Sequence, residues 1–415
     1  MQNSASTNSV QTPSAPAAKK QRGANAITAF LMLGYTLIYM DKTVIGTAMV
    51  PIASQFHLTP FQTGLFVSLF FIGYSLMQIP FGFVADHVGY KPVLIFSLSS
   101  CTVFTLLFGF AGILPLFLAI RFLTGIGDAG YPPSSAKSVA LNYPQEKRPF
   151  AQSLLLSTGG IGGVLAAIVG VPIIGHFGWR SIYYLLSGLF ALALLGIILF
   201  LPNRKPVVQE NSAHTPEQKV SFIQVIKNAN VWILFAAMMS YNMVIYSLNT
   251  WMPTFLVRVF HKKISQLTPV IGAAALLGIC GALLAGKLFG RFAGKEKPML
   301  ITAASILAVL LTTASIARQY TFVCVLFICS VFFCEIMFTG LFTWPHKIMK
   351  KELIGSSIGV VNTGGTLGGS IGPALSGCVI GASSGSFVPA FIGMGVFALL
   401  AGILALTVCN RRVED

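Results

Sequence analysis

Twelve apolar stretches, each long enough to cross a lipid bilayer, limit what this chain can fold into. A transmembrane α-helix needs about 20 predominantly apolar residues. Such stretches lie near residues 26–50, 61–86, 92–112, 115–142, 149–175, 180–202, 231–259, 266–291, 297–317, 320–349, 353–381 and 387–409. Lipid offers no hydrogen bonds to the backbone, so we expect a helix in each. The sequence predicts an all-α membrane protein with twelve transmembrane helices.

Composition supports a lipid environment. Hydrophobic residues make up 55% of the chain and charged residues only 9%, against about 25% in soluble domains. The net charge of +16 comes from basic residues in short loops between the apolar stretches, so it does not indicate a nucleic-acid partner. No metalloprotease, nucleophile-elbow or phosphate-loop motif is present, which argues against an enzyme and against a cofactor.

The seven cysteines lie within apolar stretches and form no CxxC pair. Cys324, Cys329 and Cys334 are spaced by five residues, so on a helix each is rotated by roughly 140° from the last. They share no face, which argues against a metal site. We interpret all seven cysteines as apolar packing residues.

The spans fall into two groups of six. We expect a disordered tail over 1–25, a first bundle over 26–202, a polar linker over 203–230, a second bundle over 231–409 and a short tail over 410–415. The first tail has no apolar core followed by a cleavage site, so it is not a signal peptide. Six spans on each side of a linker suggest an internal duplication of two pseudo-symmetric bundles.

Loop charge predicts the orientation. With both termini inside, the inner loops hold nineteen of the 27 Lys and Arg residues and the outer loops hold five. We therefore expect cytoplasmic termini and a cytoplasmic linker, in a multi-pass protein of the cell (inner) membrane. We expect a monomer.

The loop after the second span resembles a known signature. Gly82, Asp86, Gly89 and Lys91 fit the G-x-x-x-D-R-x-G-R-R pattern of the major facilitator superfamily, although His87 and Tyr90 replace arginines. The resemblance implies that these four matching residues act in gating. Gly82 allows two helices to approach closely, and Asp86 can cap a helix or pair with a basic residue. The loop after the eighth span is a degenerate copy that keeps glycines and basic residues.

Further motifs resemble the anion:cation symporter branch of that superfamily. They are Tyr39-x-Asp41-Lys42, Gly73-Tyr74 with Gln78-Ile79-Pro80, Tyr143-Pro144, Gly178-Trp179-Arg180, Trp251-x-Pro253, and Asn362 with Gly365, Gly368, Gly369 and Pro373. This resemblance implies alternating-access transport of a small organic anion, such as a sugar acid or another carboxylate, usually by proton symport.

Five charged residues lie in the interior of spans, namely Asp41, Lys42, Arg121, Asp128 and Glu335, and Lys137 lies near the inner end of the fourth span. A charge at the bilayer centre costs about 2.5–3.5 kcal/mol on insertion scales, so each is a candidate site residue. Asp41 and Lys42 are neighbours and point about 100° apart on a helix. The resemblance implies that Lys42 binds the substrate carboxylate and that Asp41 takes part in proton coupling. The alternative is a structural Asp41–Lys42 pair.

Arg121 and Asp128 are seven residues apart, so both face one side of a helix, about 10 Å apart along its axis. They cannot pair directly, and each needs another partner or water. The resemblance implies that Arg121 is a second anion-binding cation and that Asp128 is a proton-coupling residue. The alternative is a structural network that locks helices together.

Glu335 has no counterpart in the branch pattern. We count it with the proton-coupling candidates, but a ligand for a cationic part of the substrate and a structural pair remain open. The uncharged candidates for substrate binding are Tyr74, Gln78, Tyr241, Asn249 and Asn362.

The predicted partners are therefore an anionic small molecule, protons and the bilayer. The alternative function is a proton-coupled exporter of a drug or of a secreted metabolite such as a carboxylate siderophore. Drug antiporters carry a G-x-x-x-G-P pattern in the fifth span, and here Pro172 comes later than that pattern requires.

Overall fold

The computed structural model describes residues 15–144, 148–202, 224–292, 294–349 and 353–409. All regular secondary structure in these ranges is helical. Nine of the described helical segments are long and apolar enough to cross a membrane. The other three predicted spans are also helical within these ranges, so the all-α prediction is confirmed.

The helices of the first bundle are α1 (Ala15–Gln55), α2 (Pro60–Val88), α3 (Tyr90–Phe110), α4 (Leu114–Asp128), α5 (Tyr131–Asn142), α6 (Arg148–Leu165), the π-helix η2 (Ala166–Gly170), α7 (Val171–Phe177) and α8 (Trp179–Phe200). α1 begins at Ala15, inside the segment predicted as a disordered tail. Alanine and lysine favour helix there, and Pro16 is tolerated in a first helical turn. The rest of that predicted tail, residues 1–14, lies outside the described residues.

The helices of the second bundle are α10 (Ala229–Phe260), the 3-10 helix η3 (Ile264–Leu267), α11 (Thr268–Arg291), α12 (Glu296–Ile316), α13 (Tyr320–Thr343), α14 (Pro345–Ile348), α15 (Ile354–Ala382) and α16 (Val388–Thr407). Most of the predicted linker, residues 203–223, lies outside the described residues, as does the tail over 410–415.

The fourth span is broken, which the pattern of apolar residues does not reveal. Proline has no backbone N–H and its ring clashes with the carbonyl four residues earlier. For Pro132 that carbonyl belongs to Asp128, and α4 ends at this residue. α5 then starts at Tyr131 with proline in its first turn. The break places Asp128 at the end of α4.

Local sequence also explains two helix boundaries. Thr59 and Gln62 form a capping box at the start of α2, with each side chain accepting a hydrogen bond from the other's backbone N–H. Such a box satisfies two N–H groups that the first helical turn leaves free. Gly89 separates α2 from α3 with φ of 101°, a conformation that favours glycine. This turn gives Gly89, a predicted gating residue, a structural role.

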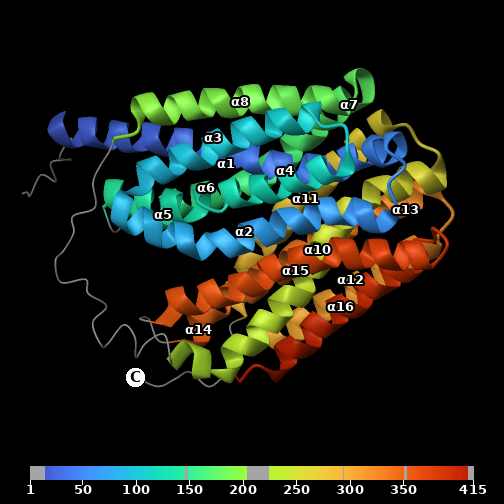
Figure 1. The fold of residues 1–415 in the computed structure, drawn as a ribbon. Helices are drawn as coiled ribbons and strands as arrows, with labels where there is room; N and C mark the ends of the chain where they lie inside the picture. The colour runs from blue at the N-terminus through green and yellow to red at the C-terminus, as the bar shows by residue number, and fades with distance from the viewer. Residues whose placement is uncertain (1–14, 145–147, 203–223, 293, 350–352, 410–415) are drawn as a thin grey trace, which may run out of the picture.

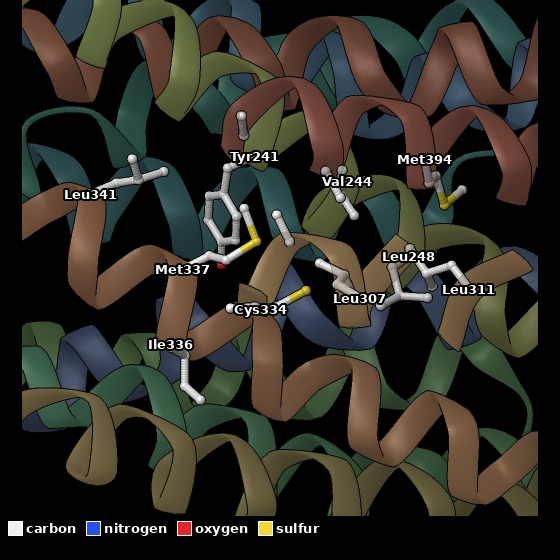
Figure 2. Close-up of a cluster of buried hydrophobic side chains, with 14 of the residues drawn as sticks. Tyr241, Val244, Leu248, Leu307, Leu311, Cys334, Ile336, Met337, Leu341 and Met394 are labelled. Carbon is white, nitrogen blue, oxygen red and sulfur yellow. The ribbon is translucent and has the colours of Figure 1, made fainter. Parts of the chain in front are cut away.

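Each bundle has its own hydrophobic core. One cluster of buried residues lies within residues 27–201, and a second extends over 225–408 and also takes in Ala167 and Val171 of the first bundle. Figure 2 shows part of the second core, where Tyr241, Val244 and Leu248 of α10 pack near side chains of α12 and α13. Packed cores resist deformation. Because the two cores are largely separate, we expect the bundles to tilt against each other more easily than either bundle deforms.

The two bundles meet closely at one end of the molecule. We call this the far end, and we call the opposite end, where residues 202 and 224 flank the linker, the linker end. α2 and α15 lie side by side at the far end and separate toward the linker end (Figure 1). Cβ atoms added at Gly64 and Gly377 would clash with the carbonyls of Pro373 and Pro60. Within the second bundle, the Trp251 indole of α10 donates a hydrogen bond of 3.1 Å to the same Pro373 carbonyl of α15. Small residues therefore bring the bundles into contact at the far end.

Candidate functional site

Two ion pairs connect α1 to α4 inside the first bundle. Arg121 Nη1 lies 3.1 Å from Asp41 Oδ2. Lys42 Nζ lies 2.7 Å from Asp128 Oδ2. We call Asp41, Lys42, Arg121 and Asp128 the charge quartet. Four of the five charged residues predicted from the spans thus come together in one site.

The pairing follows from the helix geometry noted in the sequence. Adjacent residues on α1 point in different directions, and each meets a different turn of α4. Asp41 pairs with Arg121 and Lys42 with Asp128, so the alternative Asp41–Lys42 pair is not what the structure contains. The expectation that Arg121 and Asp128 each find another partner is met by α1.

Close packing of α2 against α4 positions Arg121. A Cβ at Gly125 would clash with the Phe70 carbonyl, and one at Gly73 would clash with the Phe122 carbonyl. These glycines allow the two backbones to touch. Arg121 Nε then donates to the Phe66 carbonyl at 3.3 Å.

Arg121 is shielded from solvent by its neighbours. Its side chain is only 3% exposed, and its guanidinium lies 4.9 Å from the centre of the Phe70 ring. The sequence predicts Arg121 as an anion-binding cation, but the structure buries it against Asp41. In this conformation Arg121 is therefore less accessible to a substrate than Lys42, and its predicted role stays a prediction.

Lys42 is the more accessible cation of the quartet. Its side chain is 13% exposed, against 2% for Asp128. The ammonium lies 4.7 Å from the Tyr74 ring centre and 5.4 Å from those of Tyr39 and Phe70. Aromatic faces attract cations and hold the lysine without neutralising it. Sequence reasoning did not select Phe70, although its spacing of four residues from Tyr74 places both on one face.

A small cavity of about 10 Å³ joins the two carboxylates of the quartet. Besides Asp41 and Asp128 it is lined by Thr105 and Thr124 together with apolar side chains. This volume is about the size of one water molecule, and its lining offers several polar partners. Asp128 Oδ1 has no hydrogen-bond partner among the described residues. The arrangement provides a place for one water between the acids.

The uncharged candidates separate into two groups. Tyr74 contacts Lys42, and Gln78 lies one turn further along α2 and is partly exposed. Asn249 and Asn362 are also partly exposed. Tyr241, also a predicted substrate-binding residue, is only 2% exposed and packs in the core of the second bundle (Figure 2).

Glu335 lies where α13 approaches the boundary between the bundles. A Cβ added at Gly278 of α11 would lie 3.3 Å from Glu335 Cγ. Tyr39 of α1 and Tyr246 of α10 lie within electrostatic range of its carboxylate. Within the ranges that the structure describes, Glu335 forms no ion pair and no hydrogen bond, so the structural-pair interpretation finds no support.

The predicted gating residues occupy the linker end. Asp86 Oδ1 lies 2.7 Å from Lys137 Nζ, which links α2 to α5 and gives Asp86 the basic partner that the sequence could not identify. Lys91 instead donates to the carbonyls of Ile198 and Leu201 at the end of α8.

A second lysine and Gly82 also lie at the linker end. Lys297 makes the corresponding contact in the second bundle, with the Leu406 carbonyl near the end of α16. This repeat fits an internal duplication, because each lysine neutralises the negative end of a helix. A Cβ at Gly82 meets nothing within 4 Å, so the close approach predicted there is not formed in this conformation.

Comparisons with known proteins agree with this architecture. The chain is 27% identical over 400 residues to the probable sulfoacetate transporter SauU of Cupriavidus necator, covering 90% of this chain and 92% of that one. It is 24% identical over 428 residues to the probable galactarate/D-glucarate transporter GudP of Escherichia coli, covering 94% of each. The fold is similar to that of a bacterial homolog of the human lysosomal transporter Spinster in an inward-facing and occupied conformation. That likeness has a TM-score of 0.77 at 19% identity and covers 92% of this chain and 96% of that one.

The family itself is settled by a direct match. The model of the Major Facilitator Superfamily matches residues 31–373, which include most of the twelve predicted spans. The fold prediction and the prediction that the chain is not an enzyme are confirmed, since both the relatives and the fold are those of transporters. The chain is a multi-pass membrane transporter and belongs to the Major Facilitator Superfamily.

Proposed function

We propose that the protein is a secondary active transporter that moves a small organic anion by proton symport. The names of relatives support the substrate class, since they include probable transporters of sulfoacetate and of galactarate and D-glucarate. The observation that carries the proposal is the charge quartet, in which each cation is already matched by a carboxylate.

The balance of charge in the quartet gives a physical reason for coupling. An anion that approaches Lys42 also approaches Asp128, which occupies the same ammonium at 2.7 Å. Two anions sharing one cation repel each other strongly in a medium of low dielectric constant. A proton on Asp128 removes that repulsion and releases Lys42 for the substrate. Binding of the anion and binding of the proton then favour each other, which is the thermodynamic requirement for coupling.

The roles of the quartet divide by exposure. Lys42 binds the substrate carboxylate as a compact charge, with Tyr74 beside it and Gln78 one turn further along. Asp128 carries the coupling proton. Asp41 exchanges protons with Asp128 through the small cavity that both line. Arg121 positions Asp41 and is not a direct ligand. Asn249 and Asn362 contribute from the second bundle.

Transport proceeds by alternating access. Contacts between α2 and α15 close the far end, and separation of the same helices opens the linker end. We propose that the linker end faces the cytoplasm of a cell (inner) membrane, since the sequence assigns nineteen of the 27 basic residues to the loops on the same side as the linker. This conformation is then open to the inside. Gly82, Asp86, Gly89 and Lys91 act when the linker end closes, and the protein works as a monomer.

Reconstitution into proteoliposomes tests the proposal. Purified protein is supplied with labelled sulfoacetate, glucarate and monocarboxylates, with and without an imposed proton gradient. We expect at least one acid to accumulate against its gradient only when protons flow in the same direction. Accumulation that follows a voltage but ignores a proton gradient would contradict proton symport and leave the anion substrate in place.

Sidedness is tested separately. A single cysteine placed in the linker should react with a membrane-impermeant thiol reagent only after the cell membrane is opened, in a background where the native cysteines are replaced. Labelling of intact cells at the linker would contradict both the cytoplasmic linker and the inward-facing assignment.

A further inference from the structure

Building on the proposed anion carrier, we propose that Glu335 binds a cationic group of the substrate. This narrows the proposed substrate class to organic acids that carry both a carboxylate for Lys42 and an ammonium for Glu335, that is, to zwitterions. Of the five charged candidates in the predicted spans, Glu335 is the one that the quartet does not include, and this proposal assigns it a function.

Glu335 of the second bundle and Lys42 of the first both lie near Tyr39. Tyr39 connects the two sites, because its ring centre lies 5.4 Å from Lys42 Nζ and its hydroxyl lies within electrostatic range of Glu335. Tyr246 lies within electrostatic range of Tyr39 and Glu335. Its ring centre is 4.2 Å from that of Phe71 in the first bundle. A molecule held between Lys42 and Glu335 would thus lie among aromatic side chains from both bundles.

The surroundings of Glu335 suit an ammonium. No cation pairs with the carboxylate within the described part of the chain. Tyr39 of α1 and both Tyr241 and Tyr246 of α10 lie within electrostatic range of it, and tyrosine rings attract organic cations. Glu335 is only partly exposed, so its unpaired carboxylate is incompletely hydrated, which is costly, and an ammonium arriving with the substrate removes that cost.

Charge balance favours a zwitterion over a dianion. With one proton on Asp128 and a zwitterion bound, Asp41 pairs with Arg121, the substrate carboxylate with Lys42, and the substrate ammonium with Glu335. Every charge then has an opposite partner. A dicarboxylate would instead place its second carboxylate toward Glu335, and that arrangement requires a second proton.

Matched small acids test this inference. Binding to purified protein is measured for γ-aminobutyrate, butyrate, γ-hydroxybutyrate and succinate, and for the corresponding longer series based on valerate and caproate. These probes share the carboxylate and differ only at the other end. We expect the amino acid of the best-fitting length to bind about 10- to 100-fold more tightly than its unsubstituted acid, the range for a hydrogen bond to a charged group.

Glu335→Gln separates the inference from a general effect on folding. In this variant we expect the preference for the amino acid to disappear, while the unsubstituted acid binds at least as tightly as before. Tighter binding of the dicarboxylate or the hydroxy acid by the wild type would overturn the inference, as would a preference for the amino acid that survives in Glu335→Gln.

The same measurements on Lys42→Ala keep the two proposals apart. If simple amines without a carboxylate bind as tightly as the amino acids, and Lys42→Ala changes nothing, the anion site itself is wrong. If Lys42→Ala abolishes binding of all the acids but the ammonium brings no advantage to the wild type, only the assignment of Glu335 fails.

Discussion

The two bundles share an architecture but treat charge differently. In the first bundle, two acids and two bases meet between α1 and α4 in ion pairs of 2.7 and 3.1 Å. In the second bundle, the corresponding helices are α10 and α13. Among their described residues, Glu335 is the one carboxylate within the predicted spans. Aromatic packing holds these helices instead, as between Tyr241 and Phe338, whose ring centres are 6.0 Å apart.

This difference shows how one fold can divide its work. A network of buried pairs is neutral as a whole, yet it changes strongly when one member gains a proton or a new partner. An apolar interface has no such response. The first bundle therefore holds the groups that can couple a proton to an anion. In the second bundle, the described parts of α10 and α13 form a packed, mostly apolar surface with Glu335 as its one carboxylate.

The largest effect is expected from breaking the buried pair of the first bundle. Arg121→Ala leaves the Asp41 carboxylate unpaired in the core, which costs about 3–5 kcal/mol of folding free energy. Unfolding measured in detergent should show this loss, together with loss of transport. Glu335→Gln is the matched change in the second bundle, and because it leaves no charged partner behind we expect a change of about 1 kcal/mol or less.

A double variant sharpens this contrast. Asp41→Leu with Arg121→Met replaces both charges by apolar groups, and such replacements are often neutral for stability. We expect recovery of most of the stability lost in Arg121→Ala, without recovery of transport. Equal stability of Arg121→Ala and the wild type would show that the pair does not hold α1 to α4.

The next largest effect, on substrate binding, is expected from Lys42, the more accessible cation of the quartet. Lys42→Ala should weaken binding of the substrate anion by about 2–5 kcal/mol, since it removes one partner of a charged contact. Equilibrium binding of the labelled acid to purified protein measures this. Lys137→Ala is a matched control, because Lys137 is also a partly exposed lysine paired with an aspartate but lies at the linker end. Normal affinity in Lys42→Ala would remove Lys42 from the binding site.

These predictions depend partly on what the sequence alone could establish. Charges inside apolar spans are conspicuous because insertion penalises them, so Asp41, Lys42, Arg121 and Asp128 were identifiable as a group. Their pairing was not, because it depends on which turn of α4 faces α1. The burial of Arg121 depends in turn on the contact of Gly125 with the Phe70 carbonyl. A single glycine in a sequence does not reveal which residue packs against it.

Other features escaped the sequence for similar reasons. The pattern of apolar residues continues through Pro132, so it merged α4 and α5 into one span. Tyr241 shares the polar stretch of α10 with Asn249, yet rotation of the helix turns Tyr241 into the core. Lys137 was placed within the fourth span but not matched to Asp86, because their contact joins residues 51 apart in sequence. Periodicity fixes the face of a helix only when the neighbouring helices are known.

A more selective change separates coupling from binding. Asp128→Asn imitates the protonated acid, so Lys42 should be released permanently while the substrate site survives. We expect loss of proton-driven accumulation with retained exchange of substrate across the membrane. Counterflow and gradient-driven uptake on one preparation measure both. If gradient-driven accumulation persists, the coupling proton lies elsewhere, and Glu335 in the second bundle becomes the candidate.

The smallest effect is expected where the two bundles touch. Gly64→Ala places a methyl group against the Pro373 carbonyl, whereas Gly82→Ala on the same helix meets nothing within 4 Å. The first change should weaken the closed far end and increase labelling of a single cysteine introduced there, such as at Pro60. The second should leave that labelling unchanged, since Gly82 lies in the half of α2 that has separated from α15. Each variant carries one extra methyl group, so size and helix propensity are matched and only the neighbour differs. Equal labelling in both variants would mean that the contact between Gly64 and Pro373 does not hold the far end shut. A larger effect of Gly82→Ala would indicate that the molecule spends most of its time with the linker end closed, because only then does a methyl group at Gly82 meet a neighbour.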